Sequence, residues 1–410
     1  MLGALSDQPD GNCKRGSMRP ANKVFSSLGT TIFTVMSALA NEHGAINLGQ
    51  GFPDDEGPDD VRAYAAKALI DGPNQYPPMM GLPALRRAVA ASNKRFYGLD
   101  VDWQHEVIVT SGATEALGDC LMGLLNPGDE AIIFEPAYDS YKPVIEAMGA
   151  KAVSVALTPP KWSLPLEALE AAFTARTKLI VLNTPMNPIG KVFTRAELEA
   201  IAALLIKHDA YAICDEVYEH LVFAPTKHIP LMTLPGMRER CLRIGSAGKT
   251  FSLTGWKVGY ITGPAALIET IAKTHQFVTF TTPPALQSAI AFGLAKDDIY
   301  FEQLAAKLAA KRDLLEGLLA AAGLEVLPAD GTYFLNVDFR WTGFTGTDDE
   351  FCREITQKAK VAAIPLSAFY APGATHAPRH LARFCFCKSD EILMEAGARL
   401  RAYRQTLDEL

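Results

Sequence analysis

The sequence lacks the spacings by which cysteine and histidine usually mark metal or redox sites. Its 7 cysteines include no C-x-x-C pair, and its 8 histidines show no H-E-x-x-H spacing. Zinc sites and thioredoxin-like redox motifs depend on such spacings. We therefore expect no metal site, and we expect the cysteines to be reduced and to pack as small hydrophobic side chains.

The chain also lacks long apolar runs and concentrated charge. The first twenty residues are polar, without the apolar stretch of a signal peptide, and no run approaches the roughly 18 apolar residues of a membrane span. Lys and Arg total 39 against 46 Asp and Glu, and the resulting net charge of -7 is spread along the chain. The sequence therefore has no concentrated basic segment that would bind nucleic acid or an anionic membrane. We expect a cytoplasmic protein that acts on small molecules.

Apolar patterning predicts two domains in the 410 residues, of which 49% are hydrophobic. Short apolar runs alternate with amphipathic stretches in the middle of the chain, which predicts a mostly parallel sheet flanked by helices. The predicted strands are Val107–Thr110, Ala131–Phe134, Leu179–Asn183, Tyr211–Cys214, Cys241–Ile244 and Val258–Thr262. After Pro283, long Ala/Leu-rich helices, short strands and a final helix predict a smaller α+β domain.

Lys249 stands in the small-residue segment G-S-A-G-K-T, which begins at Gly245. A phosphate-binding P-loop would need a glycine at position 243, where the chain has Arg243. A lysine in such an uncrowded setting suits a Schiff base with an aldehyde cofactor, because its nitrogen must reach the aldehyde carbon and later move a proton. Ser246 and Lys257, close by in sequence, offer groups for a cofactor phosphate.

Asp215 follows the predicted strand Tyr211–Cys214, at the edge where open α/β sheets place their ligands. A carboxylate there can keep the ring nitrogen of pyridoxal phosphate protonated, and Tyr218 can donate to the ring's phenolic oxygen. An ordinary helix N-cap at Asp215 is an equally good interpretation of this segment by itself. Asn187, in the turn N-T-P-M-N-P-I-G, can bond the phenolic oxygen from the other side, although a plain strand-to-helix turn uses similar residues.

Two further strand ends carry candidate cofactor contacts. Ala113 and Thr114 begin a predicted helix after a strand, where backbone N–H groups can hold a phosphate. Tyr138 follows the next strand and can stack on a pyridine ring or simply pack in the core. Late in the chain, Arg383 lies in an apolar strand pattern, where its planar fork suits a substrate carboxylate.

A glycine pair near the N-terminus does not indicate a dinucleotide. The segment N-L-G-Q-G-F-P contains Gly49 and Gly51, but the Rossmann pattern needs a third glycine at position 54, where the chain has Asp54.

Taken together, the motifs resemble the fold-type-I, class I aminotransferases, especially the branch with kynurenine aminotransferase, glutamine transaminase K and bacterial methionine aminotransferase. The matching strings run in the family's order from about Val24 to Arg404 and include AINLGQGFPD, NQYPP, VTSGATEAL, FEPAYDSY, LNTPMNPIGKVF, CDEVYEHLVF, SAGKTFSLTGWKVGY, GTYF, AAIPLSAFY and RFCFCK. The resemblance implies a large pyridoxal-phosphate-binding domain at 49–298, a small domain from 22–48 and 299–410, and a disordered tail at 1–21.

The same resemblance implies a role for each matched residue. Lys249 is expected to be the Schiff-base lysine, Asp215 the partner of the ring nitrogen, and Asn187 and Tyr218 the ligands of the phenolic oxygen. The expected phosphate, stacking and substrate groups are Ala113, Thr114, Ser246, Lys257, Tyr138, Gly51, Asn187 and Arg383. Tyr76 resembles the tyrosine that reaches the phosphate of a neighbouring subunit, which implies a homodimer.

The expected activity is ping-pong transamination between a neutral, aromatic or sulfur-containing amino acid and a 2-oxo acid, with pyridoxal 5'-phosphate as cofactor. A cysteine-S-conjugate-type β-lyase would share every cofactor residue, and a succinyl-diaminopimelate-type aminotransferase is a further alternative. An aminotransferase-like transcription regulator would need a helix-turn-helix domain, for which the residues before Val24 are too few.

Overall fold

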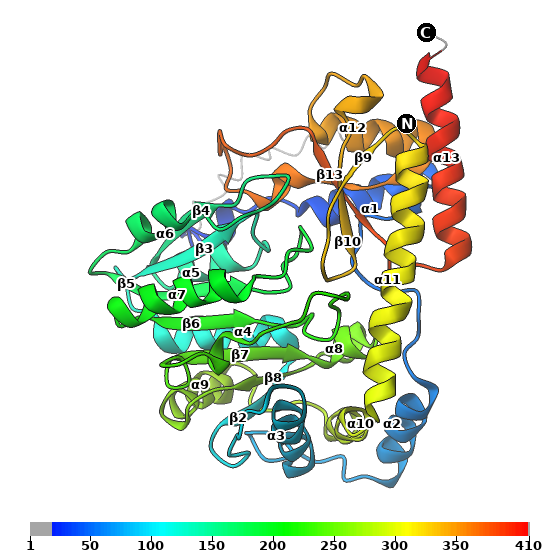
Figure 1. Ribbon diagram of the computed structural model, residues 1–410. Helices are drawn as coiled ribbons and strands as arrows, with labels where there is room; N and C mark the ends of the chain where they lie inside the picture. The colour runs from blue at the N-terminus through cyan, green and yellow to red at the C-terminus, as the bar shows by residue number, and fades with distance from the viewer. Residues whose placement is uncertain (1–18, 409–410) are drawn as a thin grey trace, which may run out of the picture.

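The structure is a computed structural model that describes residues 19–408 of the chain. Most of the predicted tail at 1–21 lies outside these described residues, as does Cys13. Within them, the chain forms a large sheet, a small sheet and one isolated pair of strands, all flanked by helices (Figure 1).

The large sheet has seven strands, and the predicted α/β class with a mostly parallel sheet is confirmed. In spatial order the strands are β2 (Val107–Ser111), β8 (Val258–Thr262), β7 (Cys241–Ser246), β6 (Tyr211–Asp215), β5 (Thr177–Asn183), β3 (Glu130–Glu135) and β4 (Lys151–Ala156). Only β8 pairs antiparallel, with β2 and β7. The inner strands are continuous apolar runs because helices cover both faces of the sheet. The prediction omitted β4, an edge strand with a partly exposed, alternating pattern.

The helices α4 to α8 connect strands of the large sheet, and the other helices come before or after it in the chain. Their bounds are α1 (Ile32–His43), α2 (Asp59–Asp71), α3 (Pro83–Tyr97), α4 (Gly112–Leu124), α5 (Tyr141–Ala147), α6 (Leu166–Ala172), α7 (Arg195–Lys207), α8 (Ala247–Thr250), α9 (Ala265–Val278), α10 (Pro284–Leu294), α11 (Asp298–Ala321), α12 (Asp348–Glu354) and α13 (Asp390–Asp408). Capping fixes several starts: at α7, the Thr194 and Glu197 side chains bond each other's backbone N–H groups.

The small sheet is antiparallel and lies at the other end of the molecule (Figure 1). Its order is β12 (Ile364–Pro365), β13 (Leu381–Cys385), β10 (Phe334–Asp338) and β9 (Glu325–Leu327). The short strands β1 (Ile46–Asn47) and β11 (Val361–Ala362) pair in parallel, which joins the N-terminal part of the chain to its C-terminal part. The long helix α11 runs along one side of the molecule, from the level of α10 to the small sheet, where it packs on α13 and β9 (Figure 1).

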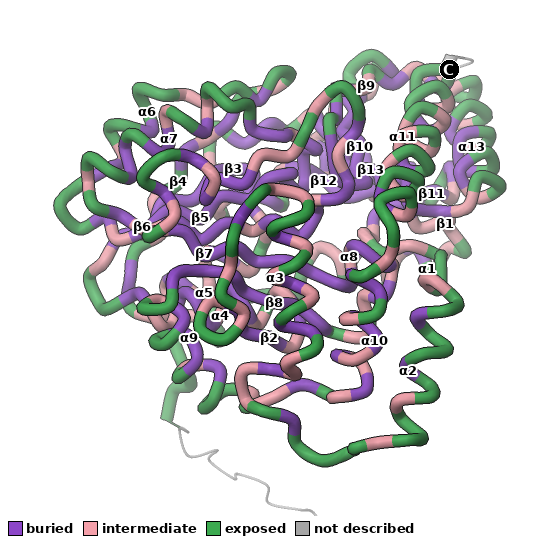
Figure 2. The backbone as a smooth tube through the Cα atoms, turned by 60° about the horizontal axis from the view of Figure 1, so that its bottom comes forward, coloured by how far each residue is buried: buried purple, intermediate pink, exposed green. Residues whose placement is uncertain are grey.

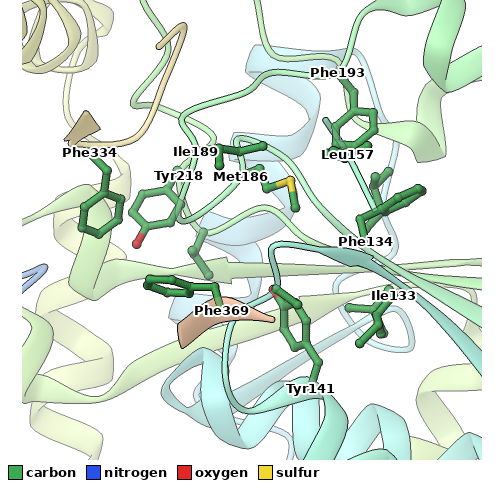
Figure 3. Packing of buried hydrophobic residues seen from close by; sticks show 14 of the residues in the cluster. Ile133, Phe134, Tyr141, Leu157, Met186, Ile189, Phe193, Tyr218, Phe334 and Phe369 are labelled. Carbon is green, nitrogen blue, oxygen red and sulfur yellow. The ribbon is translucent and has the colours of Figure 1, made fainter. Parts of the chain in front are cut away.

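Buried residues concentrate in the strands, which are almost uniformly buried in Figure 2, whereas the outer faces of the helices are exposed. The larger core cluster is continuous from the big sheet into the small one. At one end of this cluster the rings of Tyr218, Phe334 and Phe369 come together from three different elements (Figure 3). Among residues 19–408, no helix is both long and apolar enough to cross a membrane.

Candidate active site

A cleft of about 310 Å³ opens where the carboxyl ends of the parallel strands face the small sheet. Open α/β sheets bind their ligands at this edge. Nine of the twelve residues predicted for the site line it: Gly51, Ala113, Thr114, Tyr138, Asn187, Asp215, Tyr218, Lys249 and Arg383. Ser246, Lys257 and Tyr76 do not line it.

Asp215 is the last residue of β6, so its side chain emerges at the floor of the cleft rather than at a helix N-cap. Its Oδ2 accepts a hydrogen bond of 2.5 Å from the hydroxyl of Tyr141. Its Oδ1 is buried and has no hydrogen-bond partner among the described residues. Burial raises the pKa of Asp215, although the bond from Tyr141 opposes this rise. A cationic N–H group facing Oδ1 would donate a hydrogen bond to it and would offset the cost of burying the charged carboxylate.

Lys249 projects from the short helix α8 toward the same floor. Its Nζ donates a 2.7 Å hydrogen bond to the hydroxyl of Tyr333, which in turn donates at 2.6 Å to the carbonyl of Gly51. Burial lowers the pKa of Lys249. The amine is therefore neutral more often than a surface lysine, which favours its use as a nucleophile and a base.

The N-terminus of α4 forms a second side of the site. Gly259 of β8 packs against the backbone here: a Cβ on Gly259 would lie 2.6 Å from the carbonyl carbon of Gly112 and 2.8 Å from the nitrogen of Ala113. This close approach leaves the first N–H groups of α4 at the cleft wall. Lys257 Nζ lies on the other side of Gly112, 3.1 Å from where a Cβ would stand. Ser246, the buried last residue of β7, ends the adjacent strand.

Arg383 on β13 is buried and enters the cleft from the small sheet. Its Nη1 donates to Oδ1 of Asn187 at 2.8 Å, and its Nη2 donates to the carbonyl of Gly49 at 2.7 Å. The guanidinium stands 3.9 Å from the ring centroid of Phe334, and its Nε has no partner among the described residues. Burial lowers the pKa of Arg383 to about 10. A buried guanidinium with no carboxylate partner is prepared to bind an anion.

The predicted substrate contact Gly51 lies where no larger residue fits. A Cβ at this position would stand 2.5 Å from Cζ of Phe334. The backbone of Gly51 can therefore approach the aromatic wall of the cleft, while its carbonyl holds the Tyr333 hydroxyl.

Tyr76, predicted to bind the cofactor phosphate, lies outside the cleft of its own chain. Its side chain is 82% exposed and touches Phe280 edge-on, with ring centroids 5.4 Å apart. The neighbouring apolar side chains Phe277 and Val278 are also exposed.

Sequence reasoning missed three residues of the site. Tyr141 and Tyr333 hold Asp215 and Lys249, and Asp139 lines the cleft beside Tyr138. All three stand inside or next to recognised strings, FEPAYDSY and GTYF, so the signal was present in the motifs. Their roles depend on contacts between distant segments, which the motifs do not show.

The arrangement fits a cofactor with an aldehyde, a protonated aromatic nitrogen and a phosphate. Asp215 Oδ1 is a buried acceptor that needs a cationic donor, and Lys249 offers a buried amine in the same cleft. The first turn of α4, with Ala113 and Thr114 in the cleft wall and Lys257 beside it, suits a phosphate. Tyr138 offers a ring face at this side of the cleft. Pyridoxal phosphate has all three features.

Comparisons with known proteins agree with this chemistry. The family model for aminotransferase class I and II matches residues 43–400. A probable N-succinyldiaminopimelate aminotransferase of Mycobacterium tuberculosis is 44% identical over 90% of this chain and 95% of its own. Its solved counterpart superposes with a TM-score of 0.90, covering 93% of this chain and all of that one. A methionine aminotransferase of Escherichia coli is 43% identical over 91% and 96% of the two chains. Kynurenine–oxoglutarate transaminase 3 of Mus musculus is 39% identical over 93% and 90%.

Proposed function

Because the chain belongs to the aminotransferase class I and II family, whose members depend on pyridoxal phosphate, we propose that it moves an amino group between a neutral, aromatic or sulfur-containing amino acid and a 2-oxo acid by a ping-pong mechanism. The observation that carries the proposal is the pairing, in one cleft, of the unpartnered Asp215 Oδ1 with the buried amine of Lys249.

When bound, pyridoxal phosphate supplies an aldehyde carbon that bonds to amines and a pyridinium ring that withdraws electrons. Asp215, held by Tyr141, would keep the ring nitrogen protonated. Lys249 Nζ would hold the cofactor through its aldehyde carbon and, when free, would carry the substrate's α-proton. Tyr333 fixes Lys249 Nζ through its hydroxyl. Ala113, Thr114, Ser246 and Lys257 would hold the phosphate, and Tyr138 would offer its face to the ring.

Arg383 would bind the α-carboxylate that all amino acids share, with Asn187 and Gly51 beside it. The rest of the cleft then selects the side chain. Four charged residues line the cleft, and three of them are already assigned: Asp215, Lys249 and Arg383. The fourth, Asp139, has no ion pair within residues 19–408; burial raises its pKa, and the nearby Arg383 charge opposes this rise. Asp139 lines the cleft together with Phe33, Phe52 and Phe334, and its carboxylate opposes a second carboxylate on the donor, which supports neutral donors.

A donor and acceptor panel on the purified holoenzyme tests this function. We expect the best of methionine, glutamine, phenylalanine and kynurenine to exceed aspartate in kcat/KM by at least about tenfold, or roughly 1.4 kcal/mol. N-succinyl-diaminopimelate belongs in the panel because of the mycobacterial relative, and its preference over all neutral donors would contradict the substrate proposal. Pyruvate and ammonia from a cysteine conjugate, without 2-oxo acid from other donors, would indicate a β-lyase instead.

We also propose that the active unit is a homodimer in which Tyr76 reaches the phosphate site of its partner. Its exposure and its ring contact with Phe280, which follows the exposed Phe277 and Val278 in the chain, support this, since exposed apolar patches mark interfaces. Inactive Tyr76→Ala chains mixed with inactive Lys249→Ala chains should recover activity, because one site of the heterodimer then has both groups. Absence of recovery, with subunit exchange shown by mass spectrometry, would place Tyr76 in its own subunit.

The two sheets support the proposed division into a large domain at 49–298 and a small domain from 22–48 and 299–410. The large sheet lies within residues 107–262, and the small sheet within residues 325–385. Limited proteolysis should cut preferentially near residues 48 and 298 if these boundaries are correct.

A further inference from the structure

Two thiols meet at the end of β13, next to the proposed active site. The sulfurs of Cys385 and Cys387 are 3.0 Å apart, and both side chains are buried. A disulfide needs a sulfur separation near 2.05 Å, so the two atoms would have to approach each other by about 1 Å. The proposed transamination uses neither thiol.

A small reagent has a route to this pair. Cys387 lines a second cleft, of about 600 Å³, which is separate from the aromatic cleft but also reaches Lys249 and Tyr333. Lys388, Asp54 and Lys311 surround the cleft with polar groups, so it is suited to hold water. The other buried cysteines, such as Cys120 and Cys352, line neither cleft.

The backbone around the pair holds the substrate side of the active site. The N–H of Cys385 donates to the carbonyl of Leu48 at 2.7 Å, and Gly49, the next residue, accepts from Arg383. The N–H of Phe386 donates to the carbonyl of Tyr333 at 2.9 Å, and the carbonyl of Cys387 accepts from the N–H of Asp54. A change in the conformation of residues 385–387 must therefore shift the neighbours of Arg383 and Gly51.

We propose that Cys385 and Cys387 are a reversible oxidation site, at which a peroxide converts the two thiols into an intramolecular disulfide that weakens binding of the amino donor. In this step one sulfur, as thiolate, attacks a peroxide oxygen, and the O–O bond breaks to leave S–OH and hydroxide. The second sulfur attacks the first, and the S–O bond breaks. The thiols lose two protons and two electrons, and the peroxide leaves as two waters. A dithiol reductant reverses the change.

The charges around the pair favour the thiolate that this step needs. Burial raises the pKa of the Cys385 thiol, but the hydrogen bond from Cys387 and the nearby Lys388 and Arg383 charges bring it below the ordinary value. Burial raises the pKa of Cys387. These charges favour the sulfur of Cys385 as the thiolate, and the sulfur of the cleft-lining Cys387 stands in contact with it, ready to complete the disulfide.

Trypsin provides a direct readout, because it cleaves after Arg383 and Lys388 and releases the pair in one short peptide. Reduced holoenzyme is exposed to hydrogen peroxide, free thiols are alkylated, and the mass of the tryptic peptide is measured by mass spectrometry. We expect a peptide that carries no alkyl group and is two hydrogens lighter than the reduced, unalkylated peptide. Treatment with dithiothreitol before alkylation should restore the two free thiols. We expect KM for the amino donor to rise about threefold to tenfold, the scale of one disturbed hydrogen bond, and to recover on reduction.

Matched variants separate the pair from general oxidation. Cys387→Ser, or Cys385→Ala if the first variant folds poorly, should keep activity and lose the peroxide response, whereas Cys352→Ser should keep the response. A peptide that stays doubly alkylated after peroxide, or an equal rise in KM in Cys387→Ser, would overturn the proposal. The effect on KM rests on the proposed function of Arg383, but the peptide mass does not. Failure of the proposed function would instead appear as absent transamination in untreated enzyme.

Discussion

Asp215 and Glu216 are neighbours in the chain, and each has a buried carboxylate with one oxygen that has no hydrogen-bond partner among the described residues, yet only Asp215 lines the cleft. Asp215 Oδ1 faces the cleft without a partner, and burial raises the pKa of the group. Glu216 Oε2 meets Arg243 Nη2 at 2.6 Å and His228 Nε2 at 2.9 Å behind the strand. Burial alone would raise the pKa of Glu216, but the Arg243 charge and the contact with His228 hold it below its ordinary value.

The difference shows how the fold uses buried charge in two ways. The ionic cluster of Glu216, Glu219, His228 and Arg243 pairs its own charges and braces β6, β7 and the segment after β6. The cleft leaves Asp215 Oδ1 and Arg383 Nε open, at a cost in stability, so that ligands can complete them. Changes in the cluster should lower stability, and changes in the cleft should lower activity.

The largest effect is expected at Lys249. Lys249→Ala should lower kcat by at least about ten-thousandfold, since it removes both the proton carrier and the covalent attachment. Unfolding by urea should be almost unchanged. Borohydride reduction of the wild type followed by peptide mapping should place the pyridoxyl group on Lys249, and label on another lysine would contradict the assignment. The exposed Lys273→Ala provides a control that should keep full activity.

Glu216→Gln tests the ionic cluster. It should lower the free energy of unfolding by about 3–5 kcal/mol, because Arg243 is left buried with less compensation. Urea denaturation measures this loss, while kcat of the folded fraction should stay within about threefold. Glu170→Gln, which breaks the exposed pair with Lys207, should leave the free energy of unfolding nearly unchanged. A large fall in kcat of Glu216→Gln without a loss of unfolding free energy would contradict the distinction between the ionic cluster and the cleft.

Asp215→Asn tests the cleft, and like Glu216→Gln it replaces a carboxylate by an amide of similar shape. We expect kcat to fall at least about a hundredfold, as on loss of a preorganised charge. Because burial raises the pKa of Asp215, its carboxylate form is less favourable in the folded apoprotein than in the unfolded chain. The Asn variant without cofactor should therefore be at least as stable as the wild type in urea. A variant that keeps most of its activity would show that Asp215 is structural.

His275 predicts a pH dependence of stability. It bonds Glu115 at 2.7 Å and lies 3.6 Å from Asp119, and although burial lowers its pKa, the two carboxylates raise it to about 9. Since this exceeds the ordinary value of 6.5, the stabilisation is complete below about pH 6.5 and is lost as the pH rises through about 9. Urea unfolding across this range should show a loss of about 1–3 kcal/mol that is absent in His275→Gln. A flat wild-type profile would contradict the charged histidine.

The smallest effect is expected at Asp139. Asp139→Asn should raise kcat/KM for aspartate relative to methionine by about twofold to fivefold, because one repulsion across a solvated cleft is removed. Asp139→Glu keeps the charge and should keep the wild-type ratio. An unchanged ratio in the Asn variant would assign the donor preference to the aromatic walls instead.

The sequence predicted the fold and the chemistry through local patterns. Apolar runs predicted six of the seven large-sheet strands, and the motifs predicted nine residues that the structure brings into one cleft. It missed β4, whose edge position gives a weaker, alternating pattern. It missed Tyr141 and Tyr333 as partners of Asp215 and Lys249, because these contacts join residues 74 and 84 positions apart.

By itself the sequence determined where strands end and which polar groups stand at those ends, since apolar periodicity and turn residues act within a few positions. It could not decide which of the adjacent Asp215 and Glu216 faces the cleft with an open oxygen. Successive residues after a strand diverge in direction, and their partners come from segments brought together only by packing. Only the tertiary structure paired Arg243 with Glu216, left Asp215 Oδ1 without a partner among the described residues, and set the thiols of Cys385 and Cys387 in contact beside the substrate side of the site.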